Sequence, residues 1–263
     1  MNFKLFIVFM VLSSTIFSQN SKGAKKAPAT VKKTAPLPPP RIIVPANYGS
    51  VQDIDGNTYR TIKIGEQTWM ADNLKVTRFN DGSVLEKITD ISNYVLNNNE
   101  SGTKSFPSWN YYENDKTNNL NYGKLYNFAV INLEINNGRN ICPVGWHVPS
   151  KNDFEVLFNT LGGIEKVDNY LANMDAGKKL KSKDFWKLSE TPGQNSFYFN
   201  ALPGGCGIII SFESKDEIGT YWSSSNSIIG ETWCLNLFHD DDLALIQSMP
   251  NLHTGYSIRC LQD

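Results

Sequence analysis

The sequence is poor in the residue patterns from which most catalytic and metal sites are built. Its three histidines, His147, His239 and His253, are far apart, and it has no Cys-x-x-Cys or His-x-x-x-His pair. A zinc site is therefore not predicted. The sequence also lacks a Gly-x-Ser-x-Gly elbow, so we interpret Ser223 to Ser225 as a hydrogen-bonded strand end and not as a nucleophile. We predict no catalytic residue and no cofactor.

Long apolar runs are absent beyond the first twenty residues, MNFKLFIVFMVLSSTIFSQN. There, Lys4 precedes an unbroken apolar run from Leu5 to Leu12, which is typical of a secretory signal peptide, 1–18, cleaved between Ser18 and Gln19. The alternative, a membrane anchor, is disfavoured because a span needs about 20 apolar residues. No cysteine follows the run to take a lipid, and we expect no transmembrane span in the mature chain.

Residues 19–46 contain almost nothing that a core could bury. Lysine, alanine and proline dominate, and the run PLPPP favours extended polyproline geometry, so we expect an exposed, semi-rigid tether. Its basic residues either contact anionic envelope polymers or, as the composition favours, form a solvated spacer. They are Lys22, Lys25, Lys26, Lys32, Lys33 and Arg41.

Positions 1–41 contain basic residues but no acidic ones. The net charge of the whole chain therefore masks the negative charge of residues 42–263. The chain has 25 Lys and Arg against 26 Asp and Glu, and seven of the basic residues lie in 1–41. Residues 42–263 therefore carry 18 basic and 26 acidic residues, a formal net charge of −8. Because a nucleic-acid partner requires a basic surface, this balance argues against one.

Residues 47–263 are predicted to form one domain in which short strands alternate with turns. Asp55-Gly56, between alternating apolar positions, predicts a β-hairpin. Gly65-Glu66 and Asp81-Gly82 predict two further turns. The stretch DIDGN does not fit a calcium loop, because Gly56 is fourth from Asp53 and the EF-hand pattern has glycine at the sixth position.

The clearest helix signal begins at Ser150, a good N-cap with Asp153 at the third helical position. One apolar stripe follows, made of Phe154, Leu157, Phe158 and Leu161, before Gly162-Gly163 ends the helix. A second short helix is expected over about 164–174, and AGKKLKS, 176–182, adds another turn. We predict strands within 196–210, 218–225, 231–238 and 255–263.

Aromatic residues are set in the polar, irregular segment 93–121. Trp109, Tyr111 and Tyr112 either stack on sugar rings or fill a core, and the sequence leaves both open. The apolar run that follows, 122–131, is expected to be buried.

Four cysteines in an exported chain indicate disulfide bonds, and three pairings are possible. We favour the nested one, Cys142–Cys260 with Cys206–Cys234. The first bond would tie the start of the main helix to the last strand, and the second would join two strands that flank YWSSS.

The stretch ICPVGWHVPS, 141–150, raises the possibility of a thiol–imidazole pair between Cys142 and His147. A nucleophilic thiolate must be free, whereas Cys142 has a disulfide partner in this scheme. No ordered acid or second nucleophile stands near His147 in the sequence, so both residues are interpreted as structural.

The best remaining metal candidates are Asp240, Asp241 and Asp242, whose oxygens suit calcium. Consecutive aspartates on a strand cannot all face one ion, so a solvated turn is favoured and no metal is predicted.

Several separated motifs resemble, in the same order, those of the Fibrobacter succinogenes major paralogous domain family. They are DIDGNTYRTIKIGEQTWMADNL, YGKLYNFAV, CPVGWHVPSKNDFEVL, ALPGG, YWSSS and GYSIRCL. The resemblance covers about residues 48–262. It implies the cell envelope or exterior of Fibrobacter-like and Bacteroidetes-like bacteria, and it implies no particular activity.

The GWHVPS helix start, YWSSS and the closing Arg-Cys strand are also similar to the C-type-lectin-like fold, including its formylglycine-generating-enzyme branch. This resemblance implies an α+β fold, with two short helices packed on antiparallel strands after an N-terminal β-hairpin or meander. It carries over no activity, because the Trp-Asn-Asp and Glu-Pro-Asn motifs of calcium-dependent lectins are missing. In the enzyme branch a cysteine pair carries copper chemistry, whereas the cysteines of this chain are expected to form disulfides.

Three functions remain open from the sequence. The favoured one is a non-catalytic recognition module in the periplasm, on the cell surface or outside the cell, which binds polysaccharide or an envelope protein. The alternatives are a secreted enzyme, glycan-active or similar to the formylglycine-generating enzyme, and a purely structural envelope protein. Paired carboxylates for glycoside hydrolysis are set by the fold, so their spacing cannot be derived from the sequence.

Overall fold

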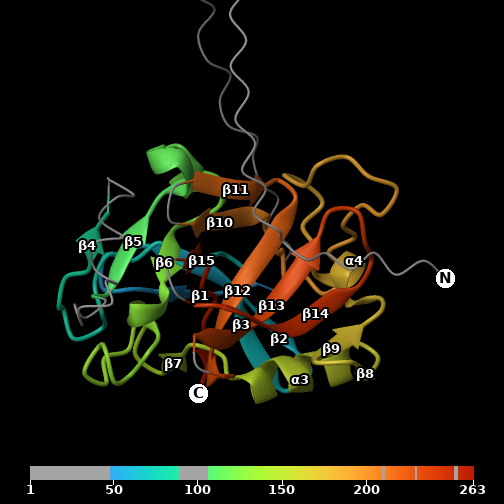
Figure 1. Cartoon of the computed structure of the whole chain (residues 1–263), viewed down its shortest axis with the longest axis horizontal. Helices are drawn as coiled ribbons and strands as arrows, with labels where there is room; N and C mark the ends of the chain where they lie inside the picture. The colour runs from blue at the N-terminus through green and yellow to red at the C-terminus, as the bar shows by residue number, and fades with distance from the viewer. Residues whose placement is uncertain (1–47, 89–105, 209–210, 229, 252–253) are drawn as a thin grey trace, which may run out of the picture. The chain divides into compact units, whose positions relative to one another are not determined.

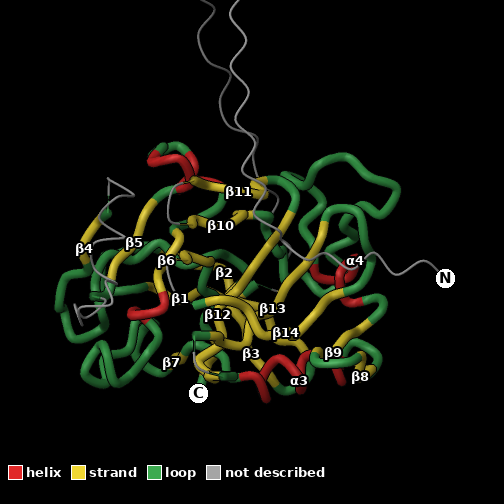
Figure 2. The backbone as a smooth tube through the Cα atoms, viewed as in Figure 1, coloured by secondary structure: helices red, strands yellow, loops and turns green. Residues whose placement is uncertain are grey.

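Strands make up most of the regular structure in the computed structural model, and the helices are few and short (Figures 1 and 2). The structure describes residues 48–88, 106–208, 211–228, 230–251 and 254–263. The predicted signal peptide, the tether and part of segment 93–121 lie outside these ranges. The described residues belong to one unit, Val44–Asp263. Among them, no helix combines the length and apolar character that a membrane crossing requires.

The smaller sheet brings the two ends of this unit together, in the strand order β1-β2-β3-β16-β7. Its strands are β1 (Gly49–Gln52), β2 (Thr58–Ile64), β3 (Gln67–Met70), β7 (Trp146–His147) and β16 (Leu261–Gln262). The hairpin predicted at Asp55-Gly56 is confirmed, since β1 and β2 pair antiparallel and Gly56 takes a φ of 84°. The turn predicted at Gly65-Glu66 joins β2 to β3.

The larger sheet has the order β4-β5-β6-β15-β10-β12-β13-β14-β9-β8, and β11 pairs with β10. The first strands are β4 (Glu86–Lys87), β5 (Ser108–Asn110), β6 (Leu125–Asn127), β8 (Glu165–Val167) and β9 (Tyr170–Asn173). The others are β10 (Gly204–Ile208), β11 (Ser211–Lys215), β12 (Ile218–Asn226), β13 (Glu231–Phe238), β14 (Ala244–Pro250) and β15 (Thr254–Tyr256). The strands predicted over 218–225 and 231–238 are confirmed as β12 and β13.

The main helix is α3 (Lys151–Thr160), which begins at the predicted cap. Ser150 Oγ accepts a hydrogen bond from the Asp153 backbone, and the Asp153 carboxylate accepts one from the Ser150 backbone. The helix packs against β12, β13 and β14 with Phe154, Leu157 and Phe158 buried (Figure 1). The other helical segments are short: α2 (Asn118–Asn121), α4 (Ala176–Leu180), and the 3-10 turns η1 (Tyr112–Asn114) and η2 (Phe128–Val130).

The helix predicted over 164–174 is wrong, because this segment is the hairpin β8–β9. Asp168 takes a left-handed backbone conformation at the turn (φ 49°), and β9 adds to β14 with Leu171 opposite Ile246. Pairing with β14 thus outweighs the local pattern. The strand predicted from 196 begins only at Gly204, since Tyr198 and Asn200 have positive φ values of 56° and 57°. Strands β11 and β14 were not predicted.

The core contains a buried cation, Arg259, in the closing Arg-Cys motif. Its guanidinium donates to the Asn73 side chain at 2.9 Å and to the backbone oxygens of Phe199 and Asn200. It also lies 5.2 Å from the ring centre of Tyr221.

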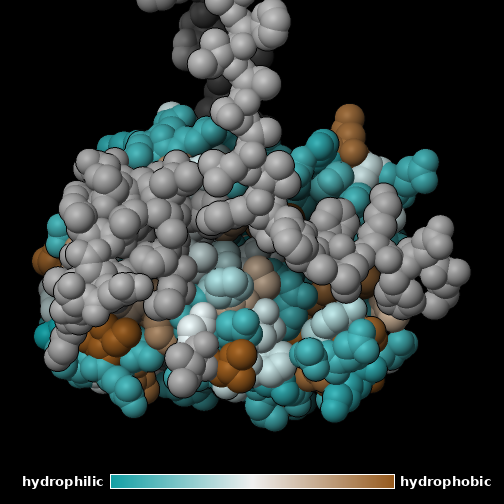
Figure 3. Space-filling view, in the orientation of Figure 1, coloured by the Kyte–Doolittle hydropathy of each residue, from teal (hydrophilic) through white to brown (hydrophobic). Residues whose placement is uncertain are grey.

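On the face drawn in Figure 3, the described surface is largely hydrophilic with scattered apolar residues, as is usual for a domain whose apolar side chains form a core.

Candidate functional site at strand β5

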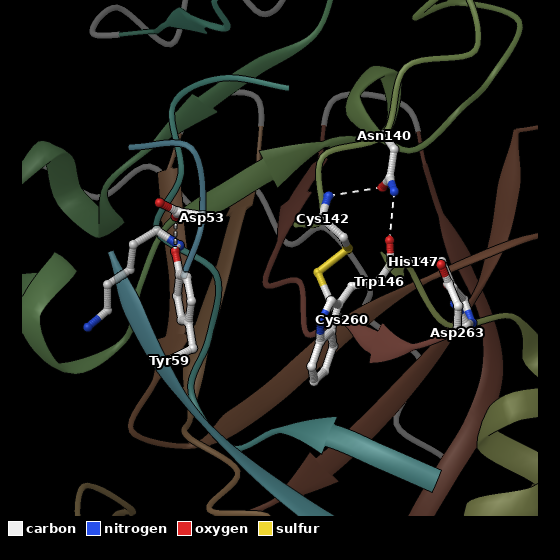
Figure 4. Close-up of a disulfide and its surroundings, with 9 residues drawn as sticks. Asp53, Tyr59, Asn140, Cys142, Trp146, His147, Cys260 and Asp263 are labelled. Carbon is white, nitrogen blue, oxygen red and sulfur yellow. Dashed lines mark hydrogen bonds and ion pairs between the residues drawn. A yellow bond between two sulfur atoms is a disulfide. The ribbon is translucent and has the colours of Figure 1, made fainter. Parts of the chain in front are cut away.

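The corner formed by ICPVGWHVPS is an architectural joint (Figure 4). The predicted bond between Cys142 and Cys260 is present, with their Cα atoms 5.9 Å apart. His147 Nδ1 lies 2.6 Å from the Asp263 carboxylate, and His147 Nε2 lies 3.5 Å from Asp153 at the start of α3. Asn140 accepts from the Cys142 backbone and donates to the Trp146 carbonyl. These contacts fasten the C-terminal strand to the start of α3, and Cys142 is not a free nucleophile.

The predicted bond between Cys206 and Cys234 is wrong, and both cysteines are free thiols. Cys206 lies on β10 and Cys234 on β13, and β12 runs between these strands. Two strand spacings amount to about 9–10 Å, whereas disulfides need Cα atoms about 4.4–6.8 Å apart. Burial raises the pKa of Cys206 to about 12 and that of Cys234 well above its usual value, so neither thiol is activated.

The acidic turn Asp240–Asp242 surrounds a cation that the chain itself provides. The ammonium of Lys181, a fully buried residue, shares its three N–H donors among four backbone carbonyl oxygens, those of Thr191, Phe238, His239 and Asp241, at 2.7, 2.9, 3.4 and 2.8 Å. In the described part of the chain, no three His, Cys, Asp or Glu side chains are grouped so that they could hold a metal ion. The turn is therefore organised around a lysine, a feature that the sequence analysis missed.

The three aromatic residues singled out from the sequence are all buried: Trp109 is 6% exposed, Tyr111 8% and Tyr112 6%. Trp109 and Tyr111 form an edge-to-face pair with ring centres 5.1 Å apart. Tyr112 lies elsewhere and packs against Phe212. The structure thus brings two of the three together. It places all three in the core, which was one of the two alternatives that the sequence left open. None offers a broad exposed face for a sugar ring.

Two lysines flank the Trp109–Tyr111 pair because of the strand register. Lys87 on β4 and Tyr126 on β6 both lie opposite Trp109, and Lys124 shares the face of Tyr126 two residues away. Lys87 Nζ lies 4.8 Å from the centre of the Tyr111 ring, and Lys124 Nζ lies 4.7 Å from that of Trp109. Lys124 stands two residues before Tyr126, and alternate residues of a strand share a face. This spacing is the sequence signal that could have identified Lys124.

Lys124 is nearly fully buried, at 4% exposure. Its ammonium donates to the Lys75 carbonyl and, at 3.2 Å, to the Asn119 side chain. Burial lowers the pKa of Lys124 to about 8, although the nearby carboxylates of Asp55 and Asp53 act in the opposite direction. A lysine with this pKa exchanges its proton near neutral pH.

Strand β5 carries three consecutive residues with a buried polar atom that lacks a hydrogen-bond partner. These atoms are Ser108 Oγ, Trp109 Nε1 and Asn110 Nδ2. Only two other side-chain atoms of this kind occur in the residues that the structure describes, on Asn236 and His239. Leaving such a group unpaired costs about 1–3 kcal/mol, so three in one strand are unusual. We call Lys87, Ser108, Trp109, Asn110, Tyr111 and Lys124 together the β5 site.

A family model described as the Fibrobacter succinogenes major domain matches residues 62–262. The chain belongs to this family. The match includes every residue of the β5 site, which is therefore part of the Fibrobacter succinogenes major domain and not an appendage to it. No curated protein and no solved structure matches the chain.

Proposed function

We propose that this Fibrobacter succinogenes major domain protein is an exported, non-catalytic recognition module that binds a polysaccharide of the cell envelope or exterior through the β5 site. The observation that carries the proposal is the run of unpaired buried polar atoms on Ser108, Trp109 and Asn110. Folded proteins pair nearly all such groups, and the exceptions call for an explanation. A polysaccharide supplies hydroxyl and ring oxygens that can pair with the Trp109 N–H on one face of β5 and with Ser108 and Asn110 on the other.

Export is proposed from the signal-peptide pattern at 1–18, and the Cys142–Cys260 bond is compatible with an oxidising compartment. A C-type-lectin-like arrangement remains a proposal for the C-terminal half. In this account the ligand is bound without calcium, because Lys181 takes the central position in the acidic turn.

The test is a glycan array probed with the purified protein, in calcium and in chelator. We expect binding that does not depend on calcium. Trp109→Phe, which removes the indole N–H, should weaken binding by roughly tenfold, since a lost hydrogen bond to a ligand corresponds to about 1 kcal/mol or more. Tyr112→Phe is the matched control and should bind normally, because Tyr112 lies outside the β5 site. Absence of any glycan binding, or equal binding by Trp109→Phe, would refute the proposal.

A further inference from the structure

We propose that the β5 site selects acidic polysaccharides, whose carboxylate or sulfate groups it binds beside Lys87 and Trp109. This inference rests on the proposed function, and it specifies the chemistry of the ligand.

The first argument is the local charge. The folded part of the chain carries a formal net charge of −8, yet Lys87 and Lys124 both lie over one pair of aromatic rings, and Lys75 is close enough to act electrostatically on Lys124. Within the described residues, none of the three forms a salt bridge with a carboxylate. Lys75 and Lys124 donate to backbone and amide oxygens, and Lys87 is exposed at the end of the sheet. A lysine cluster that forms no salt bridge among the described residues, on an acidic domain, favours an anionic ligand.

The second argument is the unpaired indole. Trp109 is only 6% exposed, and its Nε1–H has no acceptor. It lies on the face that carries both lysines, whereas Ser108 and Asn110 point to the other side of β5. An N–H donor beside two ammonium groups matches an anionic oxygen, because charge-assisted hydrogen bonds are about twice as strong as neutral ones.

The carboxylates that face this cluster are already engaged. Asp53 accepts from the Tyr59 hydroxyl at 2.5 Å and from Asn57. Asp55 accepts from Thr77 and forms an ion pair with Arg78. They offset part of the charge of Lys124, whereas exposed Lys87 forms no salt bridge with a described carboxylate.

The experiment measures the affinity of the purified protein for four probes by titration calorimetry. Polygalacturonate and dextran sulfate carry carboxylates and sulfates, while methyl-esterified polygalacturonate and dextran are their neutral counterparts. We expect each acidic probe to bind at least about tenfold more tightly than its neutral counterpart, which corresponds to about 1.4 kcal/mol. Lys87→Gln should remove most of this difference. Lys63→Gln is the control, because Lys63 is also an exposed strand lysine but pairs with Glu66 away from the site.

The outcomes separate this inference from the proposed function. Equal affinity for acidic and neutral probes, with loss of binding in Trp109→Phe, would overturn charge selection and leave polysaccharide binding in place. Charge selection that persists unchanged in Lys87→Gln would overturn the assignment to this site. A failure to bind any of the four probes would overturn the inference, and the glycan array would then decide separately on the proposed function.

Discussion

Lys181 Nζ donates a hydrogen bond to the backbone carbonyl oxygen of Asp241 at 2.8 Å, inside the turn that carries three consecutive aspartates. Three more carbonyl oxygens complete the shell, as backbone oxygens often do around a calcium ion. Burial lowers the pKa of Lys181, and Asp242, Asp241 and Asp240 counteract this. The turn thus holds one buried ammonium on its backbone oxygens, and the Asp242 carboxylate also forms an ion pair with Lys178.

Replacing Lys181 with methionine should strongly destabilise the domain. The change leaves four backbone carbonyl oxygens without their donor, and each hydrogen bond that involves a charged group typically contributes about 1.5–3 kcal/mol. Urea unfolding measures the loss. Lys183→Met is the control, because Lys183 is exposed two residues away and should change the free energy of unfolding by less than about 0.5 kcal/mol. A similar loss in both variants would contradict the role of Lys181.

Calcium should have little effect on the unsubstituted protein. A ligand at a hundredfold excess over its Kd would stabilise the native state by about 2.7 kcal/mol, enough to raise the Tm by several degrees. Without a calcium site tighter than the millimolar range, millimolar calcium should change the Tm by less than about 2 °C relative to chelator. A larger rise that is abolished when Asp240 to Asp242 become asparagines would contradict this account.

The disulfide arrangement predicts two free thiols. Titration under denaturing, non-reducing conditions should detect Cys206 and Cys234, and peptide mapping should recover Cys142 bound to Cys260. Removing this bond with a Cys142→Ser and Cys260→Ser double variant should cost up to roughly 5 kcal/mol, since it closes a loop of more than 100 residues. Detection of no free thiol would restore the nested pairing that the sequence favoured.

Lys124 predicts a dependence of stability on pH. Its pKa is about 8 in the folded protein against 10.5 for a free lysine. Between these values the unfolded chain binds the extra proton, so the free energy of unfolding should rise with pH relative to Lys124→Met, by on the order of 1–3 kcal/mol. The contribution is complete above about pH 10.5 and is lost as the pH falls through 8. Parallel stability curves for the two proteins between pH 7 and 11 would be the contrary result.

Local signals in the sequence were enough to predict several elements. Turn residues and apolar periodicity predicted the Asp55-Gly56 hairpin, the capped helix α3, and strands β12 and β13. In these elements the local pattern agrees with the burial of the side chains in the folded domain. Hairpin β8–β9 was mistaken for a helix because its stability depends on pairing with β14, which lies more than 70 residues further along the chain.

The sites depended on contacts that no local pattern contains. The Cys206–Cys234 prediction failed because the position of β12 between their strands is a property of the sheet order. Trp109 and Tyr111 were identified as candidates, but the lysines beside them come from β4 and from the position just before β6, on opposite sides of β5. Lys181 could not be assigned to the acidic turn, since its four acceptors lie between 10 and 60 residues away.

The most direct test of the central claim compares two fully buried serines by urea unfolding. Ser108 Oγ has no partner among the described residues, whereas Ser223 Oγ accepts a hydrogen bond from the Ser225 backbone at 3.1 Å. If β5 retains unpaired groups for a ligand, Ser108→Ala should leave the free energy of unfolding unchanged or raise it by about 1 kcal/mol, while Ser223→Ala should lower it by about 1 kcal/mol. Equal losses in the two variants would show that Ser108 is paired in the free protein and would contradict the account of the β5 site.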